Sequence, residues 1–195
     1  MSVERVLDQF LEEQPTKVHK SSKRLAKLVR EAYPIGVPAL IMKSSTDRLG
    51  SSAGYSFHLG TPDEMLRRLA SWLITKAGRD QRALWDLVPA LWKRHGREDV
   101  ALSALLLANL DSSIMDIDPW EILSSSINEK EPIEALILSI EELLRAGHNV
   151  PSDGVLKSWC EGRKIEADLA LIVAYVSMNY DKKIRDVKLK RILDN

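Results

Sequence analysis

The sequence is poor in the features that mark secreted, disulfide-stabilised or membrane proteins. A single cysteine, Cys160, occurs among 195 residues, which excludes an internal disulfide framework and suits a reducing cytosol. The longest apolar runs, such as residues 104–107 and 170–176, fall far short of the roughly 20 residues that a membrane-spanning helix needs. The first residues are amphipathic and acidic, unlike a signal peptide. We therefore expect a soluble, cytoplasmic protein with no membrane association.

Catalytic and cofactor signatures are absent as well. The sequence contains no glycine-rich dinucleotide motif, no P-loop, no zinc-protease His-Glu-x-x-His and no serine nucleophile elbow. The histidines are His19, His58, His95 and His148. None of them has a second potential ligand at the sequence spacing that metal sites use. We therefore expect no metal site and no cofactor, and no catalytic residue can be assigned. Cys160 is predicted to be a small buried hydrophobic residue.

No segment shows the strict alternation of a β-strand, and helical periodicity dominates instead. The stretch from Arg79 to Leu110 predicts two consecutive helices. The first has one apolar face and ends at Gly96, a residue suited to a left-handed helix end. The second is apolar nearly all round, so we place it at the centre of the fold. Because the connection is short, the two helices are predicted to form an antiparallel pair.

The remaining sequence divides into three parts. Residues 1–43 predict N-terminal helices, one of them over residues 16–33. Residues 44–60 contain eight Ser or Gly among 17 residues and predict a mobile loop, either a functional flap or a joint. Residues 61–195 predict successive helices, starting with a Thr61 cap and ending with separate helices over 164–179 and 181–193.

Helix pairs that recur every roughly 30 to 45 residues are typical of stacked helical repeats. We therefore predict a single all-α domain over residues 1–195, built as a HEAT-like α-α superhelix of antiparallel helix pairs. An irregular helical bundle is the alternative, since internal identity between the pairs is poor.

Charge is unevenly distributed, although the net charge is zero. Residues 111–153 hold ten acidic and two basic side chains, whereas residues 16–30 hold six basic and no acidic ones. In a curved stack, the basic helices at the two ends can line one concave side and bind phosphates there. The candidate nucleic-acid-binding residues are Lys20, Lys23, Arg24, Lys27, Arg30 and Lys188. The alternative is that these are simply solvated helix faces.

The tryptophans offer one further candidate. Trp72 and Trp92 fall on apolar helical faces and are predicted to lie in the core. Trp120 sits in the first turn of its helix, where a side chain is often partly exposed. We consider it a candidate for stacking on a base, with helix packing as the alternative.

In order, Gly36-Val37-Pro38, then Leu84-Trp85 to Arg97-Glu98, then the leucine-rich helix Ala101 to Leu110 resemble the DNA alkylation repair family of HEAT-like proteins. The resemblance covers roughly residues 25–125 and implies a concave basic surface for duplex DNA and excision of alkylated bases. It also implies a Trp followed four residues later by an Asp. The nearest match is Trp120 with Ser124, and a hydroxyl lacks the negative charge that stabilises a cationic transition state.

Two functions from different classes follow. The first is a non-enzymatic helical-repeat protein that binds a macromolecule, protein or DNA, on its concave face. The second is a DNA glycosylase, or a related DNA-binding protein, that acts on alkylated bases. Salt-dependent DNA binding distinguishes them, because a phosphate interface weakens steeply as salt rises.

Overall fold

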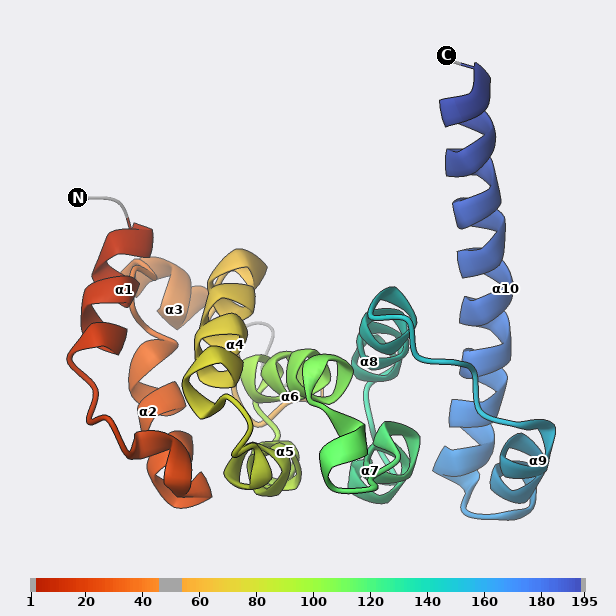
Figure 1. Cartoon of the computed structure of the whole chain (residues 1–195), viewed down its shortest axis with the longest axis horizontal. Helices are drawn as coiled ribbons and strands as arrows, with labels where there is room; N and C mark the ends of the chain where they lie inside the picture. Colours follow the sequence, from red (N-terminus) through yellow and green to blue (C-terminus); the bar gives the residue numbers. More distant parts are fainter. Residues whose placement is uncertain (1–2, 46–53, 194–195) are drawn as a thin grey trace.

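The computed structural model describes residues 3–45 and 54–193, with side chains for all of these except 114 and 181–193 (Figure 1). Regular structure in these residues is helical apart from one isolated bridge, which confirms the all-α prediction. The helices, with 3₁₀ turns named η, are α1 (Val3–Glu12), η1 (Val18–Lys20), α2 (Ser22–Ala32), α3 (Ala39–Ser45), α4 (Asp63–Ala77), α5 (Arg82–Arg94), α6 (Arg97–Asn109), η3 (Ser112–Ile114), α7 (Pro119–Ser126), α8 (Ile133–Arg145), α9 (Asp153–Glu161) and α10 (Lys164–Leu193).

The helices alternate between two rows (Figure 1). In one row α4 contacts α6, α6 contacts α8, and α8 contacts α10. In the other row α2 contacts α5 and α5 contacts α7, while α9 packs on α10. This elongated arrangement is compatible with the predicted superhelix of helix pairs. No helix within the described residues is both long and apolar enough to cross a membrane.

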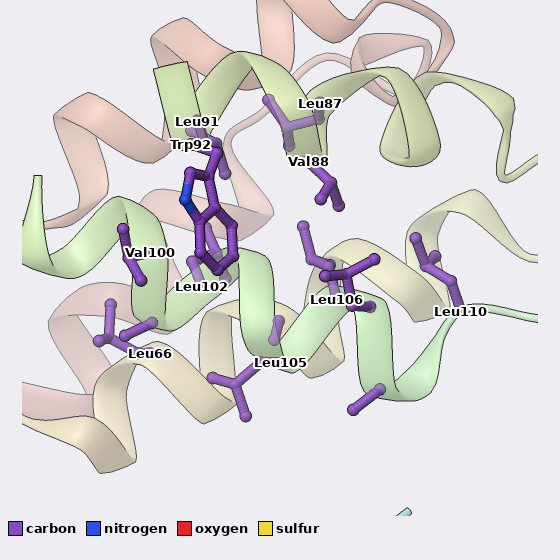
Figure 2. Close-up of a cluster of buried hydrophobic side chains, with 14 of the residues drawn as sticks. Leu66, Leu87, Val88, Leu91, Trp92, Val100, Leu102, Leu105, Leu106 and Leu110 are labelled. Carbon is purple, nitrogen blue, oxygen red and sulfur yellow. The ribbon is translucent and has the colours of Figure 1, made fainter. Parts of the chain in front are cut away.

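The core is centred on α5 and α6. Every side chain of α6 from Glu98 to Ala108 is buried, because α4, α5, α7 and α8 all contact this helix. Figure 2 shows the Trp92 ring of α5 beside Val100 and Leu102 of α6. Ser103 Oγ donates to the Val88 carbonyl over 3.3 Å. These two residues are equally far from the connecting turn, as expected for antiparallel helices.

The turn between α5 and α6 differs from the sequence-based prediction. His95, and not Gly96, adopts the left-handed conformation, with φ 59°, while Gly96 is extended with φ −75°. Glycine is required here for space, since a Cβ on Gly96 would lie 2.0 Å from the Phe57 ring. Phe57 therefore lies directly on the turn. Gly96 marks a close contact with another segment of the chain, and it does not mark the end of the helix.

Phe57 belongs to a strap, residues 55–61, that crosses the α5–α6 turn. Ser56 N donates to the His95 carbonyl over 2.8 Å, and Arg97 N donates to the Phe57 carbonyl over 2.9 Å. Residues 55–60 are thus irregular, as predicted for the loop over 44–60, and are bonded to the turn, whereas Ser44 and Ser45 belong to α3 instead. Residues 46–53 lie outside the described residues.

Three helix boundaries also depart from expectation. Ser21 breaks the helix predicted over 16–33, with its Oγ accepting from Arg24 N over 3.4 Å. Thr61 does not cap α4, because its hydroxyl donates to the Tyr33 carbonyl over 2.9 Å. The two C-terminal helices are one continuous helix, α10. The first two differences arise from hydrogen bonds of polar side chains, and the third from a helix whose backbone hydrogen bonds continue without a break. Hydrophobic periodicity predicts neither.

Candidate functional site

A group of exposed cations lies on α2 and on the η1 turn before it. We name Lys20, Lys23, Arg24, Lys27 and Arg30, all of them exposed, the α2 basic face. Its one ion pair within the described residues joins Lys27 Nζ to Glu31 Oε1 over 3.8 Å, in solvent. An exposed pair of this kind contributes at most about 1 kcal/mol. The cations therefore remain accessible to an anionic partner.

The fold holds this face outward because the opposite side of α2 is anchored in the core. Leu25 and Leu28 are buried, and α2 packs against α5. Arg94 of α5 donates from Nη1 to the Ala26 carbonyl over 3.2 Å, which fixes the two helices together. The amphipathic division expected from the sequence is present, although the helix is shorter than expected.

The second basic helix is not adjacent to the first. Figure 1 shows α2 near the N-terminal end of the stack and α10 at the other end. The side chain of Lys188 lies outside the described side chains, so its role stays a prediction. The candidate cations that the structure does bring together are those of the α2 basic face.

Trp120 is buried and lacks an open ring face for a base. Its side chain is 4% exposed, and its indole Nε1 donates to the Asn149 carbonyl over 3.0 Å. Asp118 caps the helix by accepting from Trp120 N over 2.9 Å. Ser124 Oγ donates to the Glu121 carbonyl over 3.1 Å. In this structure Trp120 is a packing residue, and we do not retain it as a stacking candidate.

Buried carboxylates, which sequence reasoning did not single out, surround the α5–α6 turn. Glu131 accepts from the Trp92 indole over 3.1 Å and lies 2.8 Å from His95 Nε2. It also accepts from Asn128 N over 3.0 Å. The His95 ring lies beside Tyr55, with ring centroids 5.8 Å apart. The left-handed conformation of His95 thus directs its side chain to the carboxylate that precedes α8.

Asp99 forms a second buried cluster with Arg94 and Tyr33. Arg94 binds both oxygens of the carboxylate, with Nε to Oδ2 at 2.6 Å, and the Tyr33 hydroxyl donates to Oδ1 over 2.9 Å. Burial raises the pKa of Tyr33 well above its ordinary value, and the neighbouring Asp99 charge raises it further. The phenol therefore stays protonated as a hydrogen-bond donor. This cluster joins the end of α2 to the start of α6.

Glu98 holds the strap. Its Oε1 accepts from the backbone amides of Leu59 and Gly60, each over 2.9 Å, and of Thr61 over 3.3 Å. His58 Nε2 lies 3.9 Å from the same oxygen. The second oxygen, Oε2, is buried without a hydrogen-bond partner. Three converging amides stabilise a carboxylate at this position, so Glu98 acts as a fastener between the strap and α6.

A cavity of about 350 Å³ lies beside the strap, lined in part by Tyr55, His58, Arg97 and Glu134. Arg97 is ion-paired, with Nη1 to Asp63 Oδ1 at 2.9 Å and Nε to Glu134 Oε1 at 3.5 Å. Burial raises the pKa of Tyr55, and the Glu134 charge adds to this effect. The contacts of Arg97 and Tyr55 with Glu134 thus hold the strap, α6 and α8 together.

Two further residues with side chains that could take part in catalysis or metal binding are His148 and Cys160. His148 Nε2 lies 2.9 Å from the Ala108 carbonyl. Cys160 is exposed, contrary to the predicted burial, because the adjacent Trp159 takes the inward position. Within the described residues no group of three or more metal-ligating side chains is present. Comparison with protein-family models, curated proteins and solved structures finds no match for this chain.

Proposed function

We propose that this protein is a non-enzymatic helical-repeat scaffold that binds an anionic macromolecular partner through the α2 basic face. The proposal rests on one observation: five neighbouring cations on η1 and α2 are exposed. These two elements lie near one end of the elongated stack (Figure 1). Phosphates of nucleic acid and carboxylates of an acidic protein segment share the chemistry that such a face recognises.

The use of the buried polar residues supports a binding role. Glu131 and Asp99 are occupied by indole, histidine, guanidinium and phenol partners. Glu98 is occupied by backbone amides. These three carboxylates therefore hold parts of the fold together, while the cations of the α2 basic face are left available for a partner.

The test measures fluorescence anisotropy of a labelled short DNA duplex and of a labelled polyglutamate peptide, titrated with the full chain at low and at physiological salt. We expect binding to at least one probe at low salt, weakening steeply as salt rises. Lys20→Glu with Lys27→Glu is expected to weaken that binding and to lower the logarithmic salt slope for DNA by about 2.

Lys130→Glu with Lys157→Glu is the matched control, because both lysines are exposed, the charge change is the same, and neither lies on α2. This control variant is expected to bind like the wild type. Binding to neither probe at low salt, or equal loss in both double variants, would overturn the proposal. DNA binding without polyglutamate binding would identify the partner as nucleic acid.

Excision of alkylated bases is a second candidate, favoured by the ordered resemblance to the DNA alkylation repair family. It has weaker support, because Trp120 is buried and Ser124 supplies no carboxylate. The check is release of a methylated purine from alkylated duplex DNA. If the chain binds the duplex at low salt and releases no base, the enzymatic candidate is excluded and the scaffold proposal stands.

A further inference from the structure

A surface cavity of about 380 Å³ lies between α4 and α6, and it shares no lining residue with the strap or with the α2 basic face. Arg67, Ser71 and Thr75 of α4 line it at intervals of four residues, so their side chains follow one side of that helix. The lining residues on α6 are Leu105 and Asn109. The volume is within the range of sites that bind small molecules.

The guanidinium of Arg67 is held in place by a carboxylate of α8. Arg67 Nη1 donates to Glu142 Oε2 over 3.1 Å, and its Nη2 donates to Glu142 Oε1. Arg145 Nη1 donates to the same Oε1. The side chain of Glu142 is 4% exposed, whereas those of Arg67 and Arg145 are 46% and 52% exposed. One buried carboxylate thus orients two accessible guanidinium groups, which leaves one positive charge uncompensated.

The surrounding charges do not remove this surplus. The hydrogen bond from Arg67 to Glu142 raises the pKa of the arginine, so the guanidinium stays charged. Asp63 also attracts Arg67, but this carboxylate already accepts from Arg97 over 2.9 Å. The cavity beside the strap has the opposite balance, because Arg97 lies there between the carboxylates of Asp63 and Glu134. Of these two cavities, the one between α4 and α6 is therefore the one suited to an anion.

We propose that the cavity between α4 and α6 binds a small phosphomonoester, with its phosphate at Arg67 and Ser71. Arg67 gives two of its five N–H groups to Glu142, which leaves three for a ligand. The hydroxyls of Ser71 and Thr75 form no hydrogen bond with any residue that the structure describes. A phosphate presents three acceptor oxygens to such a row of donors, and arginine binds it through paired hydrogen bonds.

The rest of the cavity suits the body of the ligand. Ile74 and Leu105 supply an apolar wall. Thr75 lies about 12 Å along α4 from Arg67, beyond the reach of the same phosphate, and Asn109 faces the same cavity from α6. The Asn109 amide donates to the Leu105 carbonyl over 2.8 Å and keeps its own oxygen for a hydroxyl or amine of the ligand. The site does not depend on what the α2 basic face binds.

Nuclear magnetic resonance of the ¹⁵N-labelled full chain, titrated with phenyl phosphate, tests the site. We expect saturable shifts of the backbone amides of residues 67–75 and of the Asn109 side-chain amide at millimolar ligand. Benzoate is expected to bind more weakly, since a carboxylate has fewer acceptor oxygens. The absence of saturable shifts, or shifts confined to residues 20–30, overturns this site and leaves the proposed function of the α2 basic face untouched. Equal affinity for benzoate overturns the assignment to phosphate.

Two substitutions test the charge surplus and the direct donor. Arg145→Gln removes the uncompensated charge and leaves the bond between Arg67 and Glu142 in place, while Ser71→Ala removes a hydroxyl. Each is expected to raise the dissociation constant of phenyl phosphate about tenfold, the loss of one hydrogen bond or charge contact to an anion. Arg82→Gln is the matched control, because Arg82 is exposed on α5 and the charge change is the same. The same spectra verify that each variant is folded. Equal weakening by Arg145→Gln and Arg82→Gln, or unchanged binding in both site variants, overturns the proposal.

Discussion

Helix α6 and residues 169–176 of α10 both have apolar side chains on nearly all sides, yet the fold surrounds them differently. The first is surrounded by α4, α5, α7 and α8, whereas the second contacts α8 and α9 and leaves Leu171, Tyr175 and Met178 exposed. The comparison teaches that an all-round apolar stretch of helix needs neighbours to cover it, and that the described part of the chain covers α6 on every side and α10 on one side. Matched substitutions in the two helices are therefore expected to have different effects, and these differences test the architecture.

The largest difference is expected from leucine truncation. Leu106 is fully buried in α6 and lies in the cluster of Figure 2, so Leu106→Ala is expected to lower the free energy of unfolding by about 2 to 5 kcal/mol. Leu171→Ala removes the same atoms from an exposed site of α10 and is expected to change it by less than about 0.5 kcal/mol. Urea unfolding measures both values. Equal losses would show that Leu171 is packed against other residues in the folded chain.

A smaller difference is expected from added methyl groups near the start of each helix. A Cβ on Gly96, before α6, meets the Phe57 ring at 2.0 Å, and that ring is fixed on the turn. A Cβ on Gly162, before α10, meets the Glu166 carboxylate at 2.4 Å, and this side chain can move only by giving up its hydrogen bond from Arg163 N. Gly96→Ala is expected to cost up to about 3 kcal/mol of unfolding free energy, and Gly162→Ala about 1 kcal/mol, the loss of one helix-capping bond. Thermal unfolding of the two variants decides the order, and the reverse order contradicts the strap contact.

The smallest difference is expected at alkaline pH. The folded-state pKa values of Tyr33 and Tyr55, which lie around the start of α6, are raised, so the folded protein keeps protons that the unfolded chain loses. Their contribution to stability is complete below the ordinary tyrosine pKa of about 10 and is lost as pH rises through the folded-state values.

Tyr55→Phe tests this pH dependence, because the hydroxyl forms only a 3.5 Å hydrogen bond to Glu134 Oε2. The substitution is expected to leave neutral-pH stability almost unchanged and to make the fall in stability above pH about 10 less steep, by at most about 1.4 kcal/mol per pH unit. Urea unfolding across this pH range measures the slope. An unchanged slope would mean that Tyr55 ionises equally easily in the folded chain.

Local sequence patterns predicted the all-α class and the α5–α6 pair, and some helix starts are encoded by neighbouring residues. Asp118 and Ser152 cap α7 and α9 through their own side chains, so the signal and the contact lie in the same few residues. The boundaries that failed depend on distant groups. Thr61 bonds to the Tyr33 carbonyl, and Gly96 makes room for Phe57, both far away in the sequence. Periodicity carries no information on such contacts.

The candidate sites also divide into those formed by neighbouring residues and those formed by residues far apart in the sequence. The α2 basic face was predictable, since a charged stripe opposite an apolar one needs only helical geometry. The carboxylate clusters were not, because Glu131 and His95 are 36 residues apart. One signal was present: Glu98 and Asp99 open a helix that otherwise has no polar side, and charges without a solvent-facing stripe indicate buried pairing.

The Glu98 contact makes an irregular segment part of the central folding unit. Three strap amides are bonded to a side chain of the most buried helix, so they lose these bonds only when that helix separates from the strap. Hydrogen exchange at Leu59, Gly60 and Thr61 then follows the opening of α6 instead of the fast breathing of a surface loop. A segment without regular secondary structure thereby becomes a slow-exchanging reporter of the interior.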